Sequence, residues 1–157
     1  MPPKPPLPPE LAAFIQSGIS VTVAVRDADL RPDGARAWAV QVHEDGTHLT
    51  VFLYAKTAPA LLAKLEAHPE IALDIDAPMT HRACQLKGLF TGSRRAKAGE
   101  RALVERQVEG FLTELETIGI PRALTAGWLY WPCVAFEVRV GEVFEQTPGP
   151  GAGEPLR

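Results

Sequence analysis

The stretch Met79-Thr80-His81-Arg82-Ala83-Cys84-Gln85-Leu86-Lys87-Gly88 carries several polar side chains where a β-strand should form. Gln85 and Lys87 are two residues apart, so a strand places both on the same face. Glutamine can donate and accept hydrogen bonds, and lysine favours nearby negative charge. His81 and Arg82 follow Pro78 in an expected loop, where site residues are common. The stretch therefore fits either a site for an anionic, ring-bearing ligand or the solvated face of a half-buried strand.

The composition is that of one globular domain. The chain has 157 residues, 46% hydrophobic and 22% charged. A net charge of −3 and a pI near 5.8 argue against nucleic-acid binding, which needs a basic face. Cys84 and Cys133 fall in different expected strands and match no disulfide framework or zinc pattern, which indicates a reducing, cytoplasmic setting. No apolar run approaches the roughly 20 residues of a membrane helix, so no membrane association is expected.

Proline and glycine mark both ends of the chain. Residues 1–9 include six prolines and predict an extended arm, with a groove-binding ligand for a peptide-recognition domain as the alternative. Residues 148–157 form a Pro/Gly-rich tail that we expect to lack regular structure, being either loose or ordered by a ligand or partner. Residues 10–147 make up the expected domain.

Sequence periodicity predicts an α+β fold. Helices are expected from Pro9 to near Gly18, from a Thr57 cap to Pro69, and from about Lys97 to Ile118. Strand patterns occupy 19–25, 35–43, 48–54, 71–75, 85–93 and 129–144. Asp45-Gly46 between two strand patterns indicates a hairpin. We therefore expect a six-stranded antiparallel split β-barrel whose openings are covered by peripheral helices.

Three segments resemble the FMN-binding split-barrel family typified by pyridoxamine 5'-phosphate oxidase. Arg36-Ala37-Trp38-Ala39-Val40-Gln41 resembles the family's arginine-led second strand. The stretch from Ile71-Ala72-Leu73 to His81–Gly88 is similar to the segment that meets the flavin ring, including Gln85-Leu86-Lys87-Gly88. The end, Val143-Phe144-Glu145-Gln146-Thr147-Pro148-Gly149-Pro150, resembles that of one branch of the superfamily.

The resemblance implies an FMN-binding flavoprotein, an oxidoreductase whose substrate is unknown. It also implies a homodimer with FMN in clefts shared between the subunits. Candidate cofactor-binding residues are Arg36, Trp38, Gln41, Lys56, Thr57, Arg82, Gln85 and Lys87. Two departures reduce the recognisable phosphate donors: Gln41 replaces a basic residue, and Lys56-Thr57-Ala58-Pro59 replaces a Ser-Arg-Lys run.

The chemistry of these residues agrees with a phosphate site. An FMN phosphate is a dianion and needs fixed donors such as arginine, lysine, hydroxyls and the N–H groups of a helix start. Arg36, Lys56 and Thr57 could supply them, although Arg36 could equally be a solvated strand residue and Thr57 only a helix cap. No general acid or base can be named, so catalytic residues are left unassigned.

Two other functions remain open. One is a non-catalytic split barrel that binds haem or another tetrapyrrole, with His81 as an axial ligand. The other is a cofactor-free structural dimer. His43 and His48 flank the hairpin turn, but two histidines without a carboxylate at clear spacing are weak evidence for a metal, and no metal site is predicted. Trp38, Trp128 and Trp131 fit ring stacking or, more simply, core or interface packing.

Overall fold

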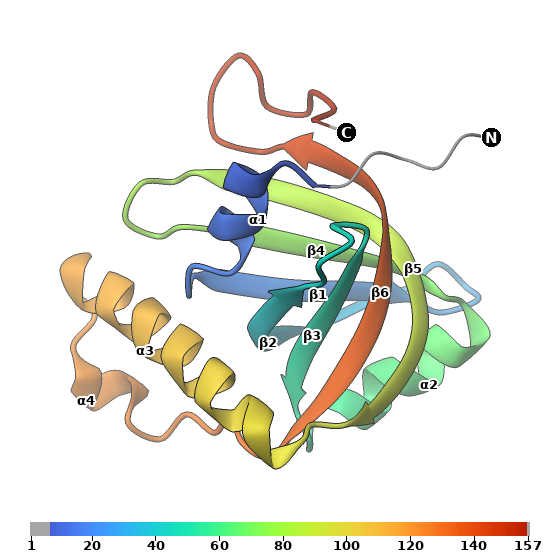
Figure 1. The fold of residues 1–157 in the computed structure, drawn as a ribbon, viewed down its shortest axis with the longest axis horizontal. Helices are drawn as coiled ribbons and strands as arrows, with labels where there is room; N and C mark the ends of the chain where they lie inside the picture. The colour runs from blue at the N-terminus through green and yellow to red at the C-terminus, as the bar shows by residue number, and fades with distance from the viewer. Residues whose placement is uncertain (1–6, 157) are drawn as a thin grey trace.

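The computed structural model describes residues 7–156 and forms a closed antiparallel β-barrel (Figure 1). Most of the expected proline-rich arm, residues 1–6, lies outside the described residues. The strand order around the barrel is β1-β2-β3-β6-β5-β4. The strands are β1 (Ser20–Arg26), β2 (Pro32–Val42), β3 (His48–Tyr54), β4 (Glu70–Asp76), β5 (Ala83–Arg95) and β6 (Cys133–Glu145). The predicted α+β fold with a six-stranded antiparallel barrel is confirmed.

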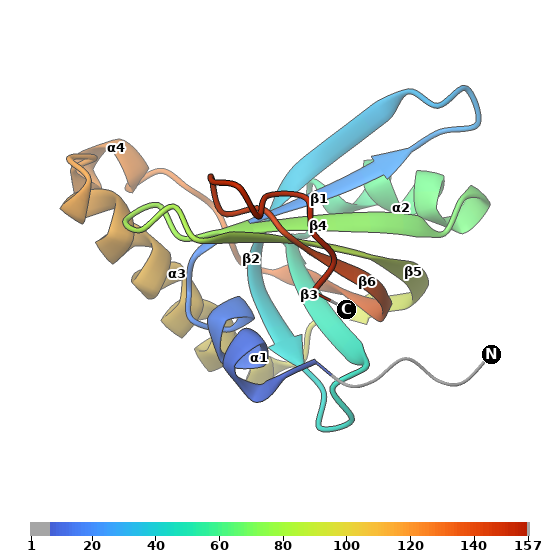
Figure 2. The ribbon, with the colours of Figure 1, turned by 90° about the horizontal axis from the view of Figure 1, so that it is seen from above.

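Two helices contribute to the core inside the barrel. Leu11 and Ile15 of α1 (Pro9–Ile15) and Leu61 and Leu65 of α2 (Ala58–Ala67) are buried with the inward-facing strand residues. Figures 1 and 2 show α1 and α2 on different sides of the barrel, as expected for helices that cover its openings. The β1–β2 hairpin projects beyond the barrel wall (Figure 2).

A longer helix covers part of the outer wall. After a 3-10 turn at Ala98–Glu100, α3 (Arg101–Thr117) packs Val104 and Val108 against Ala39, Phe52, Cys133 and Ala135. α3 also approaches the segment between α1 and β1 closely, and this contact requires small residues. Gly18 has a φ of +79°, and a Cβ there would lie 2.8 Å from the carbonyl oxygen of Gln107.

Several element boundaries differ from the sequence prediction. β6 begins at Cys133 rather than Leu129, because the chain first forms a short helix, α4 (Arg122–Thr125), and an irregular segment. β2 begins at Pro32 rather than Ala35, which lengthens the hairpin with β1. Thr57 occupies the N-cap position of α2, as expected, but its side chain makes no cap hydrogen bond, because its hydroxyl donates to the carbonyl of Tyr54, at 2.9 Å.

The Pro/Gly-rich tail forms turns and one isolated bridge rather than a helix or strand, and residues 149–156 pack back on β6. The tail turns back, and the N–H of Leu156 donates to the carbonyl of Val143, at 2.7 Å, while Phe144 forms a bridge with Pro155. β3 starts at His48, opposite Arg139, so the last residues of β6 have an edge that β3 does not cover. The tail pairs with that edge.

None of the helices in the described range is long and apolar enough to cross a membrane.

Candidate functional site

An irregularity in β2 shapes the candidate site. The register between β2 and β3 shifts between Ala37 and Ala39. Ala37 and Val40 therefore lie in the core inside the barrel, whereas Trp38 and Ala39 both pack with the outer cluster beneath α3. This bulge brings Trp38 to the outer surface.

Two of the candidate residues line one groove on that surface. Arg36, Trp38 and Tyr54 line a space of about 470 Å³ together with the loop residues 127–129. This volume is within the range of small-ligand sites. The groove combines a cation with aromatic rings, as the binding of a phosphorylated ring compound requires.

Arg36 is a half-buried cation. One of its guanidinium nitrogens donates to Ser20 Oγ, at 3.2 Å, and the group lies 4.7 Å from the ring centre of Phe111. Burial lowers the pKa of Arg36, and the charge of Asp76 opposes that shift. Within residues 7–156, no carboxylate oxygen lies within ion-pair distance of Arg36, while Arg94 and Arg122 are both paired. A partly desolvated guanidinium of this kind favours a bound anion.

Aromatic side chains surround Trp38. Its ring centre lies 5.9 Å from that of Trp128 and 6.2 Å from that of Tyr130, both tilted. Trp128 also stacks on Phe111, at 6.2 Å. Trp131 lies apart from the groove and packs beneath the guanidinium of Arg101, 5.7 Å from its ring centre. Of the three tryptophans, the structure therefore brings Trp38 and Trp128 together at the groove.

Strand register connects Arg36 to Gln85. Arg36 pairs with Thr22 on β1, Thr22 with Asp74 on β4, and Asp74 with Gln85 on β5. Residues paired in this way share one face of the sheet, and three strand spacings separate the two ends by roughly 14 Å. One extended ligand lying across the outer face of these strands could contact both Arg36 and Gln85.

Lys87 lies on the same outer face, one step further along β5. As expected from alternation, Cys84 and Leu86 are buried while Lys87 is exposed and Gln85 half-buried. The Lys87 ammonium lies 5.0 Å from the ring centre of Phe144. Lys87 also borders a second, open groove of about 520 Å³.

Lys56 and Thr57 lie at the start of α2, next to Tyr54 of the groove. Both are exposed. The backbone N–H of Thr57 donates to the carbonyl of Tyr54, at 3.0 Å. The two residues are therefore near the Arg36 groove, although they do not line it.

Gln41 and Arg82 lie away from the groove. Gln41 pairs with Thr50 on β3, several residues beyond Trp38. The guanidinium of Arg82 lies 4.2 Å from the ring centre of Phe14 in α1. His81, the candidate axial ligand, is exposed in a tight turn with a φ of +61°.

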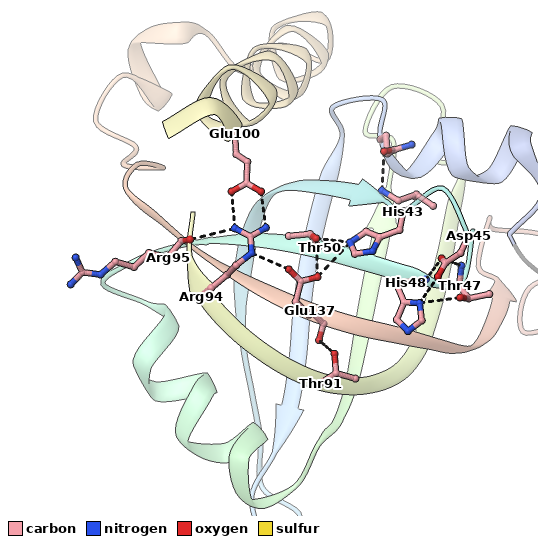
Figure 3. Close-up of polar contacts among 12 residues, drawn as sticks. His43, Asp45, Thr47, His48, Thr50, Thr91, Arg94, Arg95, Glu100 and Glu137 are labelled. Carbon is pink, nitrogen blue, oxygen red and sulfur yellow. Dashed lines mark hydrogen bonds and ion pairs between the residues drawn. The ribbon is translucent and has the colours of Figure 1, made fainter. Parts of the chain in front are cut away.

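A network of ion pairs and hydrogen bonds on the outer face was not anticipated from the sequence (Figure 3). Glu100 accepts two hydrogen bonds from Arg94, at 2.7 and 2.9 Å. Arg94 also lies 3.4 Å from Glu137, which accepts a hydrogen bond from Thr50, at 2.9 Å. His43 Nε2 lies 2.8 Å from Thr50 Oγ1. The network ties the end of β5 to β6 and β3.

His43 and His48 face each other as the hairpin predicted, with ring centres 6.1 Å apart. Their carboxylate partners differ: Asp45 lies 2.7 Å from His48, and Glu137 lies 3.5 Å from His43. In the part of the chain described, no three His, Cys, Asp or Glu side chains are grouped as a metal site.

The fold is shared with several solved structures. No family model and no curated protein matches the sequence. An F420 reductase is 18% identical, with 87% of this chain and 98% of that chain covered and a TM-score of 0.57. A protein related to general stress protein 26, of the pyridoxinephosphate oxidase family, from Clostridium acetobutylicum is 13% identical, with 85% and 83% covered and a TM-score of 0.53.

An FMN-binding protein from Syntrophomonas wolfei has the same fold, at 10% identity, with 93% of this chain and 83% of that chain covered and a TM-score of 0.51. At these identities the likeness concerns the fold. The chain therefore has the pyridoxamine 5'-phosphate oxidase-like split-barrel fold that its second strand and its β5 motif resemble.

Proposed function

We propose that this protein binds FMN and acts as an FMN-dependent oxidoreductase on a substrate still to be identified. The observation that carries the proposal is Arg36, a half-buried guanidinium with no carboxylate partner in residues 7–156, in a groove lined by aromatic rings. Asp76 acts on Arg36 only from beyond ion-pair distance, and the phosphate of FMN would supply a negative charge in direct contact. Trp38 would contact an apolar part of the cofactor.

The proposed donors would meet the cofactor at both ends. Gln85 shares a register row with Arg36, and its amide could meet both the carbonyl and the imide groups of the ring. Lys56, Thr57 and the N-terminus of α2 lie next to the groove and could add phosphate donors. Bound FMN would supply the electron or hydride transfer. The chain would fix its position, and Lys87 would favour negative charge near the ring.

We propose further that two copies of the chain form a homodimer with the cofactor clefts at the interface. On the outer face of β1 and β4, Ala24 pairs with Ala72 beside the open groove that Lys87 borders, and charged residues flank this pair, among them Arg26, Glu70 and Asp74. Small residues allow another chain to approach closely. Two free, buried cysteines need no oxidising compartment, so we expect the dimer in the cytoplasm.

The visible absorption spectrum of the freshly purified protein tests the cofactor. A flavin spectrum, with FMN identified after release by denaturation, is expected. A colourless preparation is then titrated with FMN, and saturable binding at one FMN per subunit is still expected. Failure to bind FMN would contradict the proposal. A haem spectrum that is lost in His81→Ala would instead support the tetrapyrrole-binding alternative.

A further inference from the structure

A second cavity lies behind the Arg36 groove, between the barrel, α3 and α4. It has a volume of about 230 Å³. Three aromatic rings, Trp38, Trp128 and Tyr130, line it together with Val108 and Leu112 of α3. Trp38 and Trp128 line the Arg36 groove as well, so these two indoles border both spaces.

The charged group at this cavity is already neutralised. Arg122 pairs with Glu109, at 2.6 and 2.9 Å, and with Glu116, at 2.6 Å. The buried hydroxyl of Thr125 donates to the carbonyl of Arg122, at 3.2 Å. Two carboxylates face one guanidinium, so Arg122 has no positive charge left for an anion, and the Thr125 hydroxyl already has an acceptor. The lining therefore selects an uncharged ligand.

The rings leave hydrogen-bond donors available. Within residues 7–156, no group accepts a hydrogen bond from the indole N–H of Trp38 or Trp128, or from the hydroxyl of Tyr130. Trp38 and Tyr130 are half-buried, and such donors usually find a partner, whereas Trp128 is 39% exposed and can donate to water. A ligand with an acceptor atom, such as a carbonyl oxygen, would provide one.

We propose that this cavity binds a neutral, planar compound of one or two fused rings that carries a carbonyl group. Size supports this class, because an apolar cavity of about 150 Å³ accommodates benzene, and the present cavity is larger but too small for a three-ring flavin with its side chain. Flat rings also fit between tilted aromatic side chains.

The site is distinct from the proposed FMN groove. Its ligand would contact Trp38 and Trp128, which line both spaces. Occupancy of the cavity therefore fixes the two indoles that the cofactor would also contact. The cavity is formed by one chain without a cofactor, so its ligand could bind whether or not FMN is bound.

Ligand-observed saturation-transfer NMR with 1-indanone tests the site in the full-length protein. Indane, which has the same rings without the carbonyl, is the matched probe. Saturable binding of both is expected, with 1-indanone about 2- to 10-fold tighter, the value of one added hydrogen bond. No saturable binding of 1-indanone would overturn the proposal, and equal affinities would overturn the acceptor part of it.

Substitutions that fill the cavity locate the bound probe. Leu112→Trp should weaken 1-indanone at least about tenfold by occupying its space. Leu124→Trp is the control, because Leu124 is 69% exposed and does not line the cavity. If Leu112→Trp does not fold, as judged by thermal unfolding, Ala126→Leu is used instead, because Ala126 also lines the cavity and its enlargement should weaken 1-indanone. Unchanged binding in a folded cavity variant would overturn the assignment.

Discussion

The side-chain amide of Gln107 forms hydrogen bonds with both backbone groups of Val40. Its Oε1 accepts from the N–H, at 3.0 Å, and its Nε2 donates to the carbonyl, at 2.7 Å. β1 pairs with β2 only as far as Ala37, so the following backbone of β2 has no strand on that side. Gln107, buried in α3, replaces the missing strand and holds the helix against the bulge that exposes Trp38.

Gln107→Leu should lower the free energy of unfolding by about 2–5 kcal/mol, because two buried backbone groups lose their partner. Urea denaturation measures the change. Gln16→Leu is the comparison: the half-buried Gln16 accepts from the N–H of Val42, at 2.9 Å, and donates to the carbonyl of Ala12 within its own helix, at 3.1 Å, so a smaller loss of about 1 kcal/mol is expected. Equal losses in the two variants would show that Gln107 has no special role.

Gly88→Ala should destabilise the barrel by about 1–3 kcal/mol through overpacking. A Cβ at this position would lie 2.4 Å from the carbonyl oxygen of Arg139, where β5 and β6 shift register. Gly92, at the other shift in β5, has no atom within 4 Å of such a Cβ. Gly92→Ala should therefore be neutral or stabilising in thermal unfolding. A tolerated Gly88→Ala would contradict the register at that bulge.

Both cysteines should be unreactive in the folded protein. Burial raises the pKa of the Cys84 thiol to about 12, and burial, followed by the charge of Glu100, raises that of Cys133 to about 12. The reactive thiolate is then scarce at neutral pH. Alkylation with iodoacetamide at pH 8 should be negligible until urea unfolds the protein, when both thiols react. Rapid labelling of either thiol in the native state would show that it is not buried as described.

Glu100 should contribute to acid sensitivity. The hydrogen bonds from Arg94 lower its pKa below the ordinary value of 4.5, partly opposed by burial. A carboxyl with a lowered pKa stabilises the folded state above its ordinary pKa, and this contribution is lost as the pH falls through the folded-state pKa. The free energy of unfolding should therefore fall less steeply in Glu100→Gln than in the unmodified protein between about pH 5 and 3.

The matched variant for this prediction is Glu66→Gln, an exposed residue of α2. It should keep the pH dependence of the unmodified protein. Identical profiles for all three proteins would mean that the Arg94–Glu100 pair in Figure 3 contributes nothing measurable.

Local pattern predicted the elements of the fold. Phe136, Val138 and Val140 alternate along β6, and all three are buried in the core inside the barrel, as the period of two indicates. The opposite face of the same strand was less predictable. Ala135 is also buried there, because α3 covers it. The alternation of residues along one strand does not indicate whether a helix from a distant part of the chain packs on its outer face.

Long-range partners account for most of what the sequence did not predict. Thr50 and Glu137 are 87 residues apart, and their hydrogen bond depends on the β3–β6 register. The groove is another case, because Trp128 comes from an irregular segment after α4 and meets Trp38 only in the folded chain. Arg36 and Trp38, by contrast, could be proposed from the arginine-led strand alone.

Titration of the protein with FMN, compared with Arg36→Ala, tests the central claim most directly. Arg31→Ala is the control, because Arg31 is exposed near the tip of the β1–β2 hairpin and lies 3.9 Å from Asp29. Loss of the charge-assisted contact should weaken FMN by about 1.5–3 kcal/mol in Arg36→Ala and leave Arg31→Ala unchanged. An Arg36→Ala protein that remains folded and binds FMN with unchanged affinity would contradict the phosphate assignment.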